Sequence, residues 1–215
     1  MNPFLRISCW LLALLLLAPG TTRAQNPDDV LQRTQAKYAS IDALRARFVQ
    51  KTRSDFSDRS TRATGTLYLQ GNKFRIETLG QTLVTDGATT WIYTPSENQV
   101  VVNDFVNDEQ TLTPDELFYD YPERFDVASM EAVERDGETY YVMDLTAKQD
   151  DAVYQEAQAH VRARDAMITQ MELTDTNGTT ITFDLTDIQL NPSLNANLFT
   201  FDAPDDAEIV DLRSS

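Results

Sequence analysis

The chain is predicted to fold as a mainly antiparallel protein of the α+β class, in which one large sheet curls and carries helices on its concave side. Short strands rich in large apolar residues follow one another between Gly65 and Val102. Turn signals separate these strands and the later ones, namely Gly71-Asn72, Leu79-Gly80, Asp86-Gly87, Asp136-Gly137 and Asn177-Gly178. The spacing predicts about nine to eleven strands and about two or three helices.

Residues 1–24 have the pattern of a secretory signal peptide. Arg6 precedes an apolar run from Trp10 to Ala18, and small residues suited to cleavage follow it. The run is shorter than the ~20 apolar residues that span a bilayer as a helix, and a retained N-terminal anchor is the alternative. The only cysteine, Cys9, lies inside the run. We therefore expect an exported chain that contains no cysteine once the peptide is removed.

Residues 25–215 are expected to form a single domain. The full chain has 34 Asp and Glu against 18 Lys and Arg, which gives a formal net charge of −16. This charge excludes nucleic acid as a natural partner, because proteins bind that polyanion by releasing counterions at basic contacts. The acidic residues are spread along the chain, which predicts a soluble surface. A saline habitat would produce the same composition.

Two helices can be placed by their start signals. Asn26 is suited to cap the first helix and Pro27 to occupy its first turn, and this helix is expected to run to about Ser40. The second helix is short and opens at the capping box Thr113-Pro114-Asp115-Glu116. The apolar residues expected to lie on the sheet are Leu31, Tyr38, Ile41, Leu117, Phe118 and Tyr121.

Alternation of apolar and polar residues gives the expected strands one apolar face each. The first strand runs from Leu44 to Lys51, and a polar excursion from Ser54 to Thr61 follows it. The residues that share a face are Leu44, Ala46 and Phe48; Leu67 and Leu69; Phe74 and Ile76; Trp91 and Tyr93; Tyr141, Met143 and Leu145; and Ile181, Phe183 and Leu185. Leu198 to Phe201 is expected to be a last short strand before a loose acidic tail.

No arrangement of residues typical of catalysis is found in the sequence. Carboxylate pairs such as Asp28 with Asp29 occupy first turns of expected helices, where the helix dipole accounts for them. His160 is the only histidine, and its alternation with Gln158 and Arg162 predicts that it faces water. Because motifs for nucleophilic hydrolysis, zinc, calcium and phosphate are also absent from the sequence, we expect no enzyme, no metal and no cofactor.

An ordered set of short motifs runs from about Val30 to Pro204. Its members are Tyr38 with Ile41, Phe48 with Gln50, Gly65-Thr66-Leu67, Phe74-Arg75-Ile76-Glu77, the hairpin from Asp86-Gly87 through Trp91 and Tyr93 to Pro95, Gln99-Val100, and Phe199 with Phe201. Together they resemble the LolA family of periplasmic outer-membrane lipoprotein carriers. The sequence departs from that family at Gln70-Gly71, where proteobacterial members carry an Arg-Pro pair whose arginine helps hold a lid closed, and at Ile76, where they carry tryptophan.

The resemblance implies an unclosed half β-barrel in the periplasm, whose concave apolar face binds the acyl chains of lipoproteins beneath a helical lid. It implies a LolCDE-like ABC-type release complex in the inner membrane and a LolB-like acceptor at the outer membrane, and a monomeric carrier. The residues predicted to line or cover the cavity are Phe48, Leu67, Leu69, Phe74, Ile76, Leu83, Trp91, Tyr93, Leu117, Phe118, Tyr141, Met143, Ile181 and Phe183. A polar residue at Trp91 is expected to abolish binding.

Two other functions are compatible with the sequence. The first is a lipid-binding or lipoprotein-binding sensor with the same fold, although such sensors usually carry a second domain, for which residues 25–215 leave little room. The second is an envelope hydrolase that uses Asp and Tyr side chains. A hydrolase would require a polar cavity with clustered carboxylates, whereas a carrier requires an apolar one.

Overall fold

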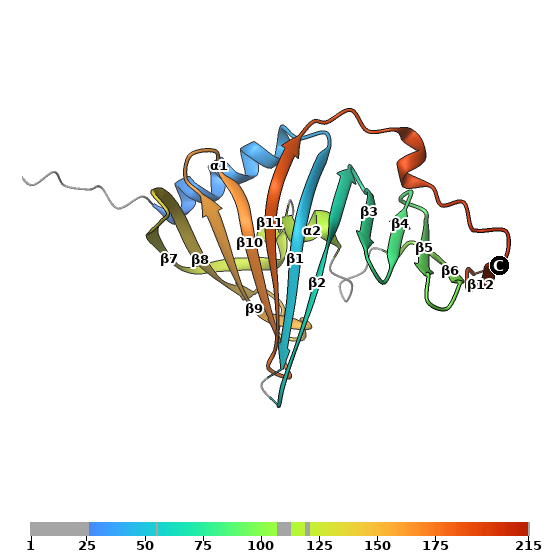
Figure 1. Cartoon of the computed structure of the whole chain (residues 1–215). Coiled ribbons are helices and arrows are strands. Elements are labelled where there is room, and N and C mark those ends of the chain that lie inside the picture. Colours follow the sequence, from blue (N-terminus) through green and yellow to red (C-terminus); the bar gives the residue numbers. More distant parts are fainter. Residues whose placement is uncertain (1–25, 55, 107–112, 119–120, 215) are drawn as a thin grey trace, which may run out of the picture.

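One large, curled sheet dominates the protein (Figure 1). The computed structural model describes residues 26–54, 56–106, 113–118 and 121–214. Within these residues the sheet has 12 strands in the order β12-β6-β5-β4-β3-β2-β1-β11-β10-β9-β8-β7. All neighbouring strands are antiparallel except β12 and β6, which are parallel. The sheet does not close on itself, so the predicted fold class, an unclosed barrel with few helices, is confirmed.

Most of the chain between residues 44 and 190 belongs to the sheet. The strands are β1 Leu44–Ser54, β2 Ser57–Gln70, β3 Lys73–Thr78, β4 Thr82–Thr85, β5 Thr89–Thr94, β6 Gln99–Asp104, β7 Phe125–Arg135, β8 Glu138–Ala147, β9 Tyr154–Arg162, β10 Met167–Asp175, β11 Thr179–Leu190 and β12 Glu208–Asp211. The helices are α1 Pro27–Ala39, α2 Pro114–Phe118, α3 Tyr121–Arg124 and the 3-10 helix η1 Ala196–Phe199.

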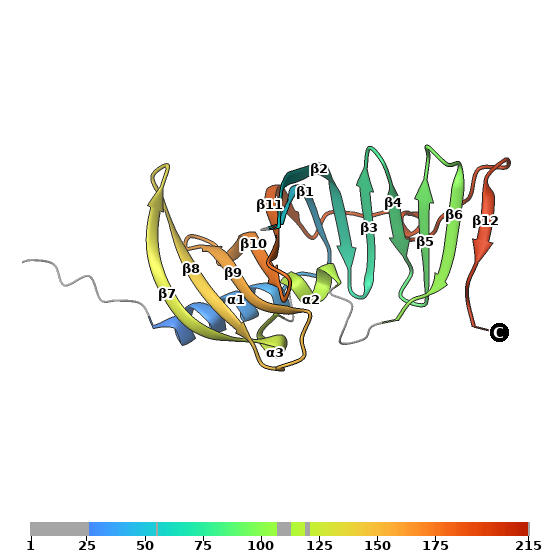
Figure 2. The same cartoon turned by 90° about the horizontal axis from the view of Figure 1, so that it is seen from below.

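Helix α1 starts as its sequence predicts and covers one part of the concave side (Figure 2). The Asn26 side chain accepts a hydrogen bond from the backbone N–H of Asp28 at 3.2 Å and so caps the helix. The face that packs on β7 and β10 buries Val30, Thr34 and Tyr38, which are four residues apart. The Tyr38 hydroxyl accepts a hydrogen bond from the backbone N–H of Ile168 on β10, at 3.2 Å. This bond fixes the end of α1 to the sheet.

Helices α2 and α3 lie on the same side of the sheet as α1 (Figure 2). They are only five and four residues long, so packing rather than helix propensity must hold them. Leu117, Phe118 and Tyr121 are all buried and belong to the same apolar core as the concave sides of the strands. Among the described residues, no helix is long and apolar enough to cross a membrane.

The polar segment after Lys51 forms strands rather than a loop. β1 continues to Ser54 and β2 begins at Ser57, with Arg53 paired to Ser60. The prediction of a polar excursion is wrong here, because the exposed side chains of Lys51, Arg53 and Arg62 give the hairpin no apolar alternation to recognise. Strand pairing holds this part of the hairpin, together with an ion pair at its base between Lys51 and Asp184 of β11, 2.8 Å apart.

A C-terminal segment covers the outer, convex face of β3 to β6 (Figure 2). Leu198 to Phe201, predicted as a strand, contributes instead to η1, and the expected loose tail contains strand β12. The Phe201 ring lies 5.5 Å from the ring of Tyr93 on β5. The carbonyl of Leu198 accepts a hydrogen bond from Nη1 of Arg75 on β3, at 3.4 Å. This half of the sheet is therefore covered on its outer face as well.

Candidate functional site

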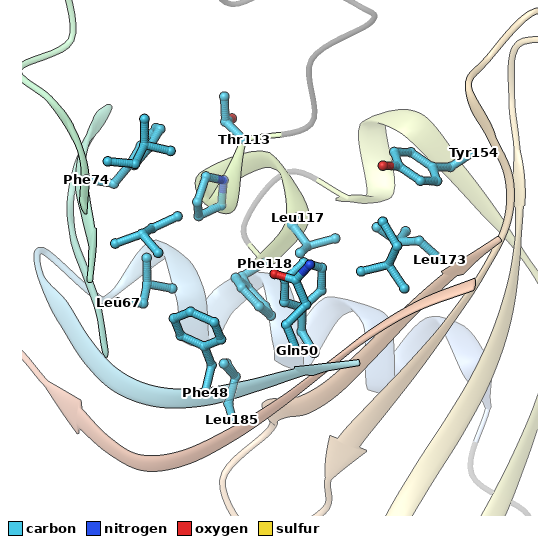
Figure 3. A pocket seen from close by; sticks show the side chains of 15 residues that line it. Phe48, Gln50, Leu67, Phe74, Thr113, Leu117, Phe118, Tyr154, Leu173 and Leu185 are labelled. Atoms are coloured by element: carbon cyan, nitrogen blue, oxygen red, sulfur yellow. The ribbon is translucent and has the colours of Figure 1, made fainter. Parts of the chain in front are cut away.

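An apolar cavity of about 260 Å³ lies between α2 and the concave side of the sheet (Figure 3). Its floor is formed by β1 and β11 and its two walls by β2 to β4 and by β9 and β10. The residues that line it are Phe48, Gln50, Leu67, Phe74, Ile76, Leu83, Thr113, Pro114, Leu117, Phe118, Tyr154, Leu173, Ile181, Phe183 and Leu185.

Strand register explains why these side chains meet. Leu67 pairs with Ile76, and Ile76 pairs with Leu83, so three neighbouring strands present apolar residues to the same side. Across the floor, Phe48 pairs with Leu185. Directly opposed residues of antiparallel strands share a face, which joins the separate apolar alternations into one surface.

Gly65 makes room for the Phe48 ring. A Cβ atom at Gly65 would lie 2.7 Å from two ring carbons of Phe48 and 2.2 Å from the carbonyl oxygen of Glu77. Such distances are well inside van der Waals contact, so this position of β2 accepts only glycine without a shift of its neighbours. The glycine lets Phe48 lie flat against β2 at the base of the cavity.

Helix α2 closes the cavity on the side away from the sheet. The backbone N–H of Leu117 donates to the carbonyl of Thr113 at 2.9 Å, which forms the first helical turn. This turn directs Leu117 and Phe118 toward the floor (Figure 3), where they are 5 % and 3 % exposed. Two buried side chains of α2 thus occupy space that a ligand would need.

The chemistry of the lining is that of a binding surface for hydrocarbon. No carboxylate, histidine or basic residue lies among the described residues that line it. Its polar side chains are Gln50, Thr113 and Tyr154. Burial, with a smaller contribution from Asp175, raises the pKa of the Tyr154 phenol, a group that is already protonated at neutral pH. In the described part of the chain, no three His, Cys, Asp or Glu residues are placed to hold a metal ion.

Most residues predicted from the sequence to form the cavity do meet around it. These are Phe48, Leu67, Phe74, Ile76, Leu83, Leu117, Phe118, Ile181 and Phe183. Leu69, Tyr141 and Met143 do not line it, although they belong to or pack against the concave core. Met143 is fully buried on β8, on the side of the sheet covered by α1. That part of the concave face is already filled by protein.

Trp91 and Tyr93 lie on the opposite face, so their predicted place in the cavity is corrected. Trp91 pairs with Val84, and Val84 pairs with Arg75, whose side chain reaches the outer C-terminal segment. Ile92, between the two aromatic residues, is the member of β5 that shares the face of Leu83. The prediction was off by one residue because β5 is apolar on both faces, which conceals which face is inner.

Several cavity residues were not predicted from the sequence. Leu173 and Tyr154 lie on β10 and β9, and the sequence analysis assigns neither residue to an apolar face. Leu185 was placed on the right face but left out of the site, and Thr113 and Pro114 were read only as a helix start. Gln50 was passed over because a polar residue on an apolar strand face is not expected to point inward. Its alternation with Phe48 was the available signal.

His160 is buried on the outer face rather than facing water, which contradicts the prediction. It is 6 % exposed, its Nε2 lies 2.9 Å from Oε1 of Gln158, and its Nδ1 lies 3.4 Å from Nη1 of Arg135. Burial, and next the positive charge of Arg135, lower the pKa of the imidazole, against an opposite effect of Glu172, Asp184 and Asp144. Polar alternation identified its face correctly, but long neighbouring side chains cover it.

Comparison with known proteins agrees with this geometry. Residues 39–202 match the family model of the outer membrane lipoprotein carrier protein LolA. The chain is 29 % identical over 208 residues to the outer-membrane lipoprotein carrier protein of Chromohalobacter salexigens, covering 94 % of this chain and 96 % of the relative. It is 31 % identical over 209 residues to that of Legionella pneumophila, covering 93 % and 96 %.

A solved structure shares the fold at low sequence identity. An uncharacterized conserved protein from Thermus thermophilus superposes with a TM-score of 0.56 at 14 % identity, over 87 % of this chain and 99 % of that one. The family match covers more than half of the chain and includes every cavity residue. The protein therefore belongs to the LolA family of outer-membrane lipoprotein carriers, whose members act in the periplasm.

Proposed function

We propose that the protein is a periplasmic carrier that binds the acyl chains of lipoproteins beneath α2 and takes them from the inner membrane to the outer membrane. The observation that supports this most is the apolar cavity, which has a helical cover and no charged side chain in its described lining. A lipid anchor gains ~0.8 kcal/mol for each CH₂ group that it buries, so acyl chains cannot cross an aqueous compartment without such a shield.

The size of the cavity indicates that α2 must move when cargo enters. Its volume of about 260 Å³ is small for an acylated ligand, since binding sites for small molecules usually span ~300–1,000 Å³. Leu117 and Phe118 occupy the space next to it. Cargo entry displaces these two side chains, and their return to the sheet offsets part of the binding free energy when cargo leaves. A carrier needs this compensation in order to release its cargo.

The route proposed here has a donor and an acceptor. Residues 1–24, which lie outside the described residues, act as a cleaved signal peptide, and residues 25–215 remain as one monomeric carrier domain. A LolCDE-like release complex of the inner membrane supplies the lipoprotein, and a LolB-like protein or the outer membrane itself receives it. The hydrolase alternative would need clustered carboxylates in the cavity, and its described lining has none.

The experiment that tests the carrier function is release from spheroplasts. Purified protein is added to spheroplasts that hold newly acylated lipoprotein in the inner membrane, and the soluble fraction is assayed for a complex of the two proteins. The expected result is a one-to-one soluble complex with the acylated form. If lipoprotein is not released, or if a variant that lacks the acylated cysteine is bound equally well, the proposed function is contradicted.

A further inference from the structure

Gln50 places an amide group in the otherwise apolar floor of the cavity. It lies on β1 two residues after Phe48, and its register partner on β11 is Phe183, so it shares the concave face with both. Figure 3 shows its side chain below α2, which contributes Leu117 and Phe118 to the same lining. An apolar side chain would fill this position without placing a polar group among hydrocarbon.

The hydrogen-bonding groups of this amide have few partners within the protein. Nε2 of Gln50 lies 3.5 Å from Oγ1 of Thr52, at the outer limit of a hydrogen bond. Within the described part of the chain, no other hydrogen bond involves the Gln50 side chain. An amide has two N–H donors and one carbonyl acceptor, and because Gln50 is only partly buried these groups stay accessible from the cavity. The amide is therefore available to a ligand.

Tyr154 brings a second donor to the same cavity from β9. In Figure 3 the Tyr154 ring lies in the wall formed by β9 and β10, and its hydroxyl is directed into the cavity. A phenol is protonated at neutral pH and can donate a hydrogen bond, and burial raises the pKa of this one further. No described residue forms a hydrogen bond with this hydroxyl. Two neutral donors thus face a space whose other lining residues are apolar apart from Thr113.

We infer that Gln50 and Tyr154 each donate a hydrogen bond to a carbonyl oxygen of the linkages that join acyl chains to their headgroup. The ligand chemistry that fits is a long hydrocarbon with a neutral acceptor at one end, such as a glyceryl ester or an N-acyl amide. A bare hydrocarbon or an ether-linked chain fills the same volume but offers no carbonyl. The inference rests on the proposed function, and it makes the cavity specific for acyl groups rather than for apolar chains in general.

The test compares two synthetic lipopeptides that differ only in this linkage. One carries a dipalmitoylglyceryl cysteine, and the other carries the dihexadecylglyceryl ether analogue. Their affinities are measured by displacement of a fluorescent fatty acid from the purified mature chain. The wild-type protein is expected to bind the ester about 2- to 10-fold more tightly, which is the effect of one or two neutral hydrogen bonds.

Variants assign the difference to these side chains. Gln50→Leu is expected to weaken binding of the ester and leave binding of the ether unchanged, so that the difference between the two affinities becomes smaller. Tyr154→Phe is expected to reduce the difference in the same way. Gln189→Leu is the matched control, because it removes the same amide from an exposed position on the outer face of β11 and should change neither affinity. If Gln50→Leu does not fold, Gln50→Met and Tyr154→Phe replace it.

The outcomes separate this inference from the function on which it rests. Equal binding of ester and ether by the wild-type protein overturns the inference and leaves the carrier function standing. An equal loss of both affinities in Gln50→Leu also overturns it, because that result indicates a packing role. Binding of neither lipopeptide by the folded wild-type protein contradicts the carrier function itself.

Discussion

At the scale of single residues, the direction of each strand side chain decides whether it meets the cavity or the outer surface. Ile181 and Phe183 line the cavity. Thr182, between them, points outward and is not part of the lining. Changes at adjacent positions are therefore expected to have different consequences. Ligand binding responds to changes on the inner side, and changes on the outer side act mainly on solubility and strand pairing.

Ile181→Gln tests this assignment at the cavity wall. The variant is expected to bind a fluorescent fatty acid about 5- to 150-fold less tightly, because burying an unsatisfied amide against hydrocarbon costs ~1–3 kcal/mol. Val49→Gln on the outer face of β1 is the control and should leave affinity unchanged. Similar losses in the two variants would show that the cavity is not where the probe binds.

His160 gives the protein a pH-dependent stability. Because burial lowers its pKa in the folded state, the unfolded chain binds the proton more readily. Stability contributed by the neutral imidazole is therefore fully present above a pH of about 6.5 and is lost as the pH falls through the lower folded-state value. His160→Gln is expected to flatten the dependence of urea unfolding on pH between about 7.5 and 5.5. Equal slopes for wild-type and variant protein would contradict this assignment.

Residues of the cavity could be predicted wherever one face of a strand is apolar and the other polar. Ile181 and Phe183 alternate with threonine and aspartate, so their common face was clear from the sequence. Trp91 alternates with Ile92, and a C-terminal segment far away in the chain decides which face is covered from outside. Single-strand alternation contains no information on that segment, and the error at Trp91 and Tyr93 follows from it.

At the scale of elements, helix α2 covers the part of the concave face that the proposed ligand would occupy. Phe118→Ala removes a buried ring from α2 and is expected to lower the free energy of unfolding by up to ~3–5 kcal/mol. The same change should tighten binding of a fluorescent fatty acid, because less cover has to be displaced. Phe125→Ala, in the core but outside the cavity, should lose stability without any gain in affinity. Weaker binding in Phe118→Ala would make Phe118 a ligand contact instead.

The packing of β1, β2 and β3 depends on one small residue. Gly65→Ala would place a methyl group against the Glu77 carbonyl and the Phe48 ring. The expected cost is ~1–3 kcal/mol, which lowers the melting temperature by roughly 2–12 °C in a domain of this size. Thermal unfolding followed by circular dichroism measures it, with Gly80→Ala, at an exposed turn with open space around it, as the control. Equal melting temperatures for the two variants would mean that β2 and β3 are not in this contact.

Elements were predictable where a local signal coincides with the tertiary structure. The Asn26 cap with Pro27 and the capping box at Thr113 both start helices in the structure. η1 was predicted as a strand because the apolar residues of Leu198 to Phe201 suit either conformation, and packing on the sheet decides between them. The tip of the β1–β2 hairpin is exposed, so it leaves no periodic pattern in the sequence.

At the scale of the whole molecule, other parts of the chain cover one part of each face of the sheet. Helix α1 fills one part of the concave side and the C-terminal segment covers the outer face of the other part. The cavity remains between them, beneath the short helix α2 (Figure 3). Helix α2 is only five residues long, so under the proposed carrier function it is the element expected to move when cargo enters.

The direct test of the central claim is whether an acyl chain enters this cavity. A photoreactive amino acid is placed at Leu83, which faces the cavity, or at Val84, the next residue on the opposite face. Each protein is irradiated with a diacylated lipopeptide and with its deacylated form, and cross-links are mapped by mass spectrometry. The account predicts a cross-link from position 83 to an acyl chain, none from position 84, and none with the deacylated peptide. A cross-link from position 84 alone, or equal capture of the deacylated peptide, would contradict it.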